Sequence, residues 1–252
     1  GSVVYVDLGK ATGVLFASEQ IPGERYYTGQ RIKVYVVRVE QTARGPQIVL
    51  SRAHANMVKH LFELEVPEIE AGSVEIVAIA REAGVRSKVA VRSHAAGVDA
   101  VGTFVGGRGS RVQAVMGDLG EEKIDIIPYA EDPEVFIANA LSPTKVVSVT
   151  LNDVDKKAVV RVPEDQLSLA IGKQGQNVRL AAKLTGWNID IISADESRVE
   201  AAAAAAEPEA EGDEPRPKAK AEKVDLESSL IDAVNAGSTG QADVLSGQEP
   251  TE

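Results

Sequence analysis

The chain has 252 residues, no cysteine and a formal net charge of −11 at pH 7. The lack of cysteine excludes disulfides, zinc–thiolate sites and cysteine nucleophiles, and it fits a cytoplasmic protein. No apolar run approaches the roughly 20 residues that a membrane-spanning helix needs, and no basic-then-apolar signal peptide is visible, so we expect no membrane partner.

The acidic charge is concentrated near the C-terminus. Residues 1–198 carry 23 Lys and Arg against 25 Asp and Glu, whereas residues 199–252 carry 4 against 13. The C-terminal stretch is rich in Ala, Pro and Glu, and such a composition cannot bury enough apolar surface to offset chain entropy. We therefore expect a largely disordered acidic tail over 196–252, which solubilises the protein, competes with nucleic acid for a basic face or contacts a partner.

Short strands separated by Gly and Pro turns predict a small β-barrel at the start of the chain. The expected strands cover residues 3–8, 13–17, 31–39 and 47–51. Small barrels of this kind bind single strands by stacking and a cationic groove. Phe16 is therefore a candidate stacking residue and Lys10 a candidate phosphate contact. Tyr35 is a further stacking candidate, although any of these aromatics could instead belong to the core.

Helical spacing of apolar residues over 53–65 predicts an amphipathic helix that ends before Pro67. One series of elements then occurs twice: a helix, a hairpin, a helix, a glycine loop, a helix and a strand. A unit that recurs with its surroundings indicates a duplicated supersecondary structure. The expected hairpins, paired helices and closing strands cover residues 74–91, 98–105, 110–119 and 123–127 in the first copy, and 146–162, 166–171, 176–184 and 187–192 in the second.

Each copy contains a G-x-x-G loop between two helices, the arrangement by which a KH domain clamps a single-stranded backbone. Glycines without Cβ let a phosphodiester approach closely, and the following helix offers unpaired amides to an anion. We expect Phe104 and Val105 in the first copy, and Ala170 and Ile171 in the second, to form apolar walls for bases. The alternative is that each loop is only a tight connection between helices. The candidate RNA contacts are Gly106, Gly107, Arg108, Gly109 and Arg111 in the first copy, and Ile171, Gly172, Lys173, Gln174, Gly175, Asn177 and Arg179 in the second.

The glycine-rich sequence does not match an enzyme motif. A Walker loop needs Ser or Thr after Gly-Lys, but Gln174 follows Lys173, and a dinucleotide fingerprint needs a strand where helical sequence stands. His54 and His60 are expected on different faces of a helix, in capping or solvated roles rather than as metal ligands. We therefore expect no catalytic residue, no cofactor and no metal.

The order of a small barrel, a helix and two KH units resembles the RNA-binding half of the NusA family of bacterial transcription factors. The resemblance implies an α+β multidomain fold: a partial S1 (OB-type) barrel over 1–52, a linking helix over 53–66 and type II KH domains over 67–130 and 131–195. The resemblance begins at what is usually the second strand of the barrel, so we expect the first strand to be missing. The N-terminal polymerase-binding domain of the family is also expected to be missing. The resemblance rests on Val6–Gly9, Arg44–Arg52, Leu61–Ile69, Gly109–Val115, Glu121–Ile127 and Leu169–Ala181.

Proteins of this family bind nascent single-stranded RNA, including ribosomal RNA leaders, and modulate pausing, termination and antitermination. The resemblance thus implies RNA polymerase and other antitermination factors as partners, and we expect a cytoplasmic monomer. Two alternatives remain open. One is an RNA-degradation accessory, since exoribonucleases also carry KH and S1 modules, although usually in the reverse order. The other is a protein-interaction scaffold whose KH units no longer bind RNA.

Overall fold

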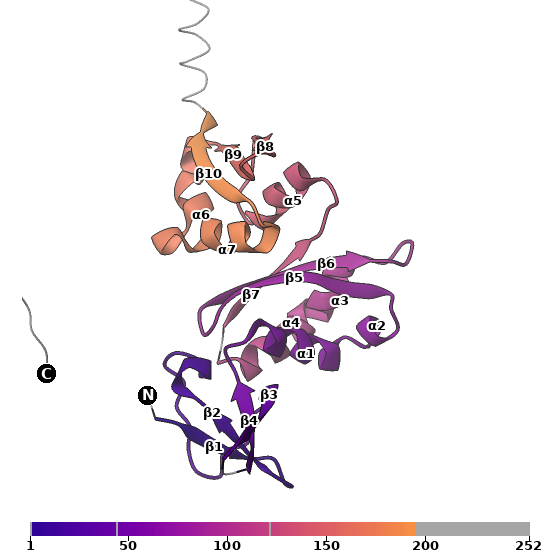
Figure 1. Ribbon diagram of the computed structural model, residues 1–252. Coiled ribbons are helices and arrows are strands. Elements are labelled where there is room, and N and C mark those ends of the chain that lie inside the picture. Colours follow the sequence, from indigo (N-terminus) through magenta and orange to yellow (C-terminus); the bar gives the residue numbers. More distant parts are fainter. Residues whose placement is uncertain (1, 44, 121, 195–252) are drawn as a thin grey trace, which may run out of the picture. The chain divides into compact units, whose positions relative to one another are not determined.

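The computed structural model describes residues 2–43, 45–120 and 122–194, so the acidic tail predicted over 196–252 lies outside the described residues. The described chain contains one four-stranded and two three-stranded sheets, which follow one another along the sequence (Figure 1). No helix among these residues is long and apolar enough to cross a membrane.

The N-terminal sheet has the strand order β1-β2-β4-β3. The β1–β2 and β3–β4 pairs are antiparallel, and β2 and β4 are parallel. The third strand was predicted to begin at residue 31, but its pairing begins at Tyr35, opposite Ser51. The prediction was wrong for residues 31–34 because β4, the strand that pairs with β3, ends at Ser51, after which the chain turns into a helix. The elements are β1 (Val4–Asp7), β2 (Thr12–Leu15), the 3-10 turn η1 (Ala17–Glu19), β3 (Tyr35–Thr42) and β4 (Gly45–Ser51).

The first KH unit contains the linking helix as part of its core. The apolar face of α1 (Met57, Val58, Leu61 and Phe62) is buried with residues of the sheet and of the loop helices. Its three-stranded sheet pairs β5 and β6 antiparallel and β6 and β7 parallel. The elements are α1 (Ala55–Glu65), α2 (Pro67–Glu70), β5 (Val74–Glu82), β6 (Arg86–Ser93), α3 (Ala100–Val105), η2 (Gly107–Gly109), α4 (Ser110–Asp118) and β7 (Lys123–Pro128).

The second KH unit repeats this order and this pairing. The strands β8 and β9 are antiparallel, β9 and β10 are parallel, and two helices again lie between the second and third strands. The duplication predicted from the sequence is therefore confirmed. The elements are α5 (Pro133–Ala140), β8 (Ser148–Asn152), β9 (Lys157–Val162), η3 (Glu164–Gln166), α6 (Leu167–Ile171), η4 (Lys173–Gly175), α7 (Gln176–Thr185) and β10 (Asn188–Ser193).

Both faces of the β5–β6–β7 sheet are covered. The helices α1, α3 and α4 lie on one face, and α5 and α7 of the second unit lie on the other (Figure 1). Cross-strand partners Ala78, Ala90 and Ile127 form a row that packs in one core with α5 and α7. These alanines leave room for the helices to approach closely. The buried ammonium of Lys88 adds a bond of 3.0 Å to the carbonyl oxygen of Ser142 in the second unit.

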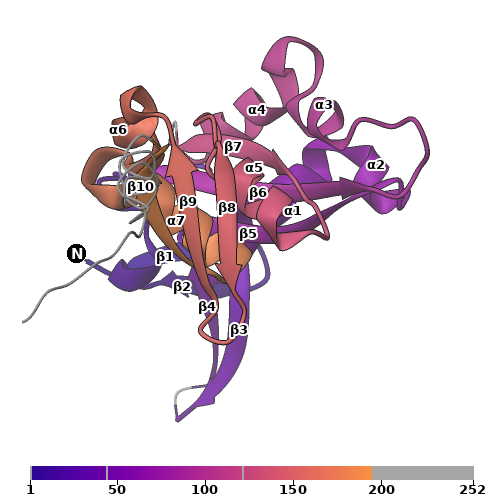
Figure 2. The same ribbon diagram turned by 90° about the horizontal axis from the view of Figure 1, so that it is seen from above.

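The β8–β9–β10 sheet differs from the first because helices of the described residues cover only one of its faces. Its other face, seen in Figure 2, carries side chains such as Thr150, Arg161 and Asp190, which are not buried. Burial alternates along β9 but is continuous through the middle of β6. The two copies thus share a topology, but only the first has a sheet enclosed on both sides.

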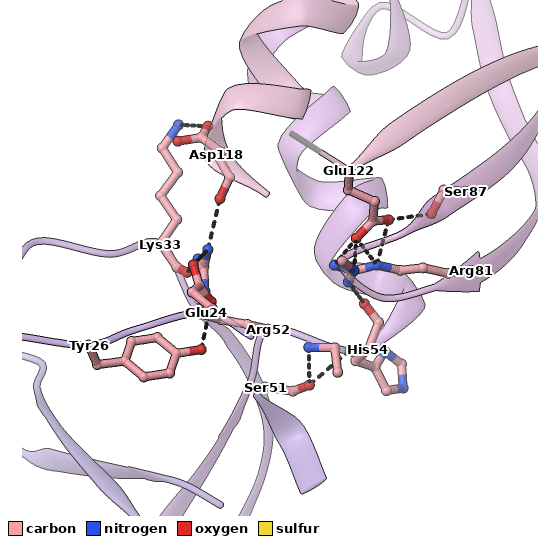
Figure 3. Close-up of polar contacts among 12 residues, drawn as sticks. Glu24, Tyr26, Lys33, Ser51, Arg52, His54, Arg81, Ser87, Asp118 and Glu122 are labelled. Atoms are coloured by element: carbon pink, nitrogen blue, oxygen red, sulfur yellow. Dashed lines mark hydrogen bonds and ion pairs between the residues drawn. The ribbon is translucent and has the colours of Figure 1, made fainter. Parts of the chain in front are cut away.

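Arg52, directly after β4, ties the four-stranded sheet to α4 (Figure 3). Its side chain is 3% exposed and forms an ion pair with Glu24. Its Nη1 donates to the carbonyl oxygen of Lys33 at 2.6 Å, and its Nη2 donates to that of Asp118 at 2.8 Å. The Lys33 ammonium also pairs with the Asp118 carboxylate at 2.8 Å. Buried polar groups that satisfy one another in this way fix the contact between the two domains.

A second buried ion pair closes the β5–β6 hairpin against the start of β7 (Figure 3). Arg81 pairs with the buried carboxylate of Glu122 at 2.9 Å and also donates to the carbonyl oxygen of His54 at 2.8 Å. The same carboxylate accepts hydrogen bonds from the Ser87 hydroxyl and the Gly84 amide. The hairpin is therefore held to the residue that precedes α1.

Candidate nucleic-acid interface

The two G-x-x-G loops adopt the same backbone conformation. Gly106 has φ 75° and ψ 171°, and Gly172 has φ 73° and ψ 173°. This region of backbone space is essentially open to glycine alone. Gly109 and Gly175, which end the loops and precede α4 and α7, are both left-handed. The first and last glycines of each loop, Gly106, Gly109, Gly172 and Gly175, therefore fit the positive φ angles of the turn.

The third residue of each loop is also left-handed, although it is not glycine: φ is 55° at Arg108 and 53° at Gln174. This turn directs the middle residues outward, and Gly107, Arg108, Lys173 and Gln174 are exposed. Neither Arg108 nor Lys173 forms an ion pair with another of the described residues. Each loop tip therefore presents to solvent a cation with no ion-pair partner among the described residues.

The helices that follow the loops begin without a side-chain cap, since Gly109 and Gly175 occupy the cap positions. The helices α4 and α7 begin with amides, those of Ser110 and Gln176, that donate to the loop carbonyl oxygens of Gly107 and Lys173. Their aligned dipoles place a partial positive charge at the same point. An anionic group such as a phosphodiester can be bound there without any side-chain rearrangement.

Arg111 and Asn177 lie at equivalent positions after the two loops, and both brace the loop from inside. Arg111 Nη1 donates to the carbonyl oxygen of Thr103 at 2.8 Å, and its Nη2 lies 3.1 Å from Glu68 Oε1. The buried Asn177 donates from Nδ2 to the carbonyl oxygens of Ala170 and Leu141, each 3.1 Å away. Both residues were predicted as RNA contacts, and the structure places them between the loop helices.

Arg179 is held at the side of the second loop. Its Nε donates to Glu82 Oε1 at 2.6 Å, and its Nη1 donates to the carbonyl oxygen of Gln174 at 3.1 Å. The hydrogen bond to Glu82 raises the pKa of Arg179. Its side chain remains 47% exposed, so the guanidinium lies beside the loop tip with part of its surface open to a ligand.

Of the residues expected to form apolar walls beside the loops, Ile171 is exposed and Val105 is half-buried, whereas Phe104 and Ala170 are buried. Ile171 is 41% exposed and Leu169 is 44% exposed, so both can contact a base next to the loop. Phe104, one of the two residues expected to play this role in the first copy, is fully buried and packs against Phe62 with ring centroids 5.4 Å apart. That prediction was wrong because Phe104 belongs to the core that joins α3 to α1.

The barrel candidates lie on loops of the N-terminal sheet. Lys10 is exposed in the β1–β2 turn, and Phe16 is half-buried just before η1. Neither forms an ion pair or hydrogen bond with a described residue of the G-x-x-G loops. The Tyr35 ring stacks with both His54 and His60, with centroids 5.1 and 5.4 Å away, so its faces are already engaged.

His54 has the capping role that the sequence predicted. Its Nδ1 accepts a hydrogen bond from the Asn56 amide at 3.0 Å and so caps α1. The expectation that His54 and His60 lie on different faces was wrong, since both reach Tyr35. The helical spacing argument does not apply to His54 because its backbone is extended and it precedes the helix.

Comparison with protein families assigns all three parts of the described chain. The model described as S1 RNA binding domain matches residues 2–51. The NusA-like first KH domain matches residues 52–129, and the NusA-like second KH domain matches residues 133–199. Residues 2–199 are the S1–KH–KH portion of the NusA family. The fold class expected from the sequence, an S1 domain followed by two KH domains, is thereby confirmed.

Curated relatives named transcription termination/antitermination protein NusA match the same region. The relative from Mycobacterium tuberculosis is 59% identical over 194 residues, which cover 75% of this chain and 56% of the relative. The relative from Bacillus subtilis is 55% identical over 195 residues (77% and 53%), and that from Thermus thermophilus is 54% identical over 199 residues (79% and 51%). The chain spans about half the length of these NusA proteins.

Sequence reasoning missed the carboxylates beside the loops of this NusA-type chain. Glu68 pairs with Arg111 and Glu82 pairs with Arg179. Both glutamates carry a lowered pKa; for Glu68 its own backbone and then Arg111 are the main causes, and for Glu82 the main cause is Arg179. No spacing in the sequence indicates these pairs, because the partners lie far apart along the chain and meet only through the tertiary fold.

Proposed function

We propose that this chain binds single-stranded RNA through its two G-x-x-G loops and acts in the control of transcription. The observation that carries the proposal is the pair of loops with the same backbone conformation. Each loop is exposed, precedes a helix without a side-chain cap and carries a cation that no described residue pairs with. Two such sites on one chain favour an extended, unpaired polynucleotide over a small anion.

In this proposal, phosphodiesters bind at the loops and bases contact the surfaces beside them. The positive ends of the α4 and α7 dipoles attract phosphate oxygens, while Arg108 and Lys173 add charge that salt screens. Bases pack on the exposed Ile171 and Leu169 in the second copy. Phe16 and Lys10 supply a further contact on the S1 domain, and Arg111 and Asn177 act by holding the loop helices in position.

Membership in the NusA family supports a role at the bacterial transcription complex. The proposed ligand is the nascent transcript, including ribosomal RNA leaders, and the proposed partners are RNA polymerase and other antitermination factors. We propose that the chain modulates pausing, termination and antitermination in the cytoplasm as a non-catalytic monomer. The acidic segment over 196–252 is proposed to compete with RNA for the basic loop tips.

The proposal is tested by replacing the two middle residues of either loop with aspartates. The variants are Gly107→Asp with Arg108→Asp, and Lys173→Asp with Gln174→Asp. Aspartate tolerates the left-handed conformation of the third loop position better than most residues, so the fold should persist. Each variant should bind an unstructured RNA roughly tenfold more weakly or worse, a loss of about 1.4 kcal/mol or more.

Binding is measured by fluorescence anisotropy at several salt concentrations, because phosphate contacts predict a linear fall of log K with log salt. Circular dichroism of each variant reports whether the fold is retained. Substitution of two exposed residues in the β8–β9 turn, Asp153 and Lys156, is the control for changes of charge outside the loops. Folded loop variants that bind RNA as tightly as the unchanged chain would contradict the proposal.

A further inference from the structure

Glu82 belongs to the first KH unit, yet both of its carboxylate oxygens are bonded to the helix that follows the second loop. Oε1 accepts from Arg179 Nε at 2.6 Å, and Oε2 accepts from Gln176 Nε2 at 2.8 Å. Gln176 is the first residue of α7, and Arg179 lies one turn further on. The hydrogen bond from Arg179 lowers the pKa of Glu82, so the carboxylate is ionised at neutral pH.

The guanidinium that Glu82 holds also touches the second loop itself, because Arg179 donates to the carbonyl oxygen of Gln174. Through Arg179, the negative charge of Glu82 is therefore linked to the loop tip at which a phosphate would bind. Lys173 lies in the loop before α7, and Lys183, in the last turn of α7, also acts electrostatically on Glu82. The carboxylate thus offsets part of the positive charge that the second loop offers to RNA.

We infer that Glu82 competes with RNA phosphate for Arg179 and thereby limits the affinity of the second loop. The inference rests on the proposed function and extends it to a residue outside the loops. When a phosphodiester binds beside Gln174, its oxygens take the place of the Glu82 carboxylate on the guanidinium. Arg179 then contacts the phosphate, whereas in the unbound protein its guanidinium is paired with Glu82.

This exchange does not require the KH units to separate. Their interface consists mainly of the apolar contacts of Ala78, Ala90 and Ile127 with α5 and α7, together with the bond from Lys88 to Ser142. The pair of Glu82 and Arg179 lies at the edge of this interface, with side chains 21% and 47% exposed. Partly exposed ion pairs contribute little to stability, so the carboxylate can be removed without loss of the fold.

The test is the substitution Glu82→Gln in the full chain, with oligouridylate as the probe. It removes the charge but keeps a side chain that can still hydrogen-bond to Gln176. We expect roughly threefold tighter binding at low salt and a slope of log K against log salt that is steeper by about 0.7, the value for one added single-strand phosphate contact. Both changes arise because Arg179 becomes available to RNA.

Glu75→Gln is the matched control, since it makes the same change of charge on the same strand. Glu75 lies seven residues earlier on β5, about 23 Å away along an extended strand, and pairs with Arg92 and His94. It should leave the affinity close to that of the unchanged chain. Thermal unfolding of both variants shows whether either substitution disturbs the fold.

A second variant separates competition from a positioning role. In an Arg179→Gln background, Glu82→Gln should no longer tighten binding, because the cation that it releases is absent. Equal or weaker binding by the single variant Glu82→Gln would overturn the inference and make Glu82 a brace for the loop. If the unchanged chain did not bind RNA at all, the proposed function would fail first, and the loop variants would show this independently.

Discussion

Gly107 and Gly172 are both loop glycines, but at the scale of single residues only Gly172 has to be glycine. Gly172 combines φ 73° with ψ 173°, and a Cβ there would lie 2.9 Å from the Asn177 amide nitrogen and Cβ. At Gly107 the backbone is not left-handed and a Cβ would meet nothing within 4 Å. Lys173 occupies the equivalent place in the second loop, so a side chain is compatible with this position.

Gly172→Ala should therefore destabilise the second KH unit by about 1–3 kcal/mol, the usual range for a residue forced into such a conformation. Gly107→Ala, the matched substitution, should change the free energy of unfolding by less than about 0.5 kcal/mol. Urea unfolding followed by circular dichroism measures both. Equal stability of the two variants would contradict the argument from backbone conformation.

The sequence predicted these loops well because a glycine turn between helices is a local feature. It did not predict what holds them. Asn177 bonds to Leu141, just after α5, and Arg179 bonds to Glu82 in a different domain. Such partners are set by tertiary packing, and one sequence contains no spacing that reveals them. The burial of Phe104 was missed for the same reason, since its neighbour Phe62 lies on the linking helix.

At the scale of elements, the central strands β6 and β9 have the same place in their sheets but different surroundings. Ala90 on β6 is buried against α5 and α7, whereas Arg161 at the corresponding position of β9 is not buried. A strand that is enclosed on both faces reads as a continuous apolar run, and one that is enclosed on a single face alternates. The run Val89-Ala90-Val91 carries this signal.

Ala90→Arg would place in the first unit the residue that the second unit has at this position. Because no water reaches Ala90, which is 0% exposed, an unpaired charge there should cost more than about 2 kcal/mol. Arg161→Ala on β9 should cost less than about 0.5 kcal/mol. Thermal and urea unfolding compare the pair. Unchanged stability of Ala90→Arg would show that the contact between the KH units contributes little to the free energy of unfolding.

At the scale of the whole molecule, the charge of the chain is divided between its two parts. Residues 1–198 are close to neutral, and residues 199–252 carry most of the net charge of −11. The cations proposed to contact RNA, Arg108 and Lys173, are exposed. A tethered polyanion is present at a high effective concentration near such cations, so it competes with RNA even when its own affinity is weak.

A chain of residues 1–198 should accordingly bind unstructured RNA a few-fold more tightly than the full chain at low salt. The difference should shrink as salt screens both interactions. Anisotropy titrations of both chains across salt concentrations measure the effect. A full-length chain with Asn and Gln in place of the Asp and Glu of residues 199–252 is the control, because it keeps the length and removes the charge. Identical affinities for all three chains would exclude competition by the acidic segment.

The enclosed β5–β6–β7 sheet has a consequence for how this protein can be divided. Its row of small apolar residues is complementary to α5 and α7, so an excised first KH unit would present a bare hydrophobic face and tend to self-associate. The second unit, whose open face is polar, would lose only the cover over its helices. Domain shuffling that moved one copy without the other would therefore be disfavoured.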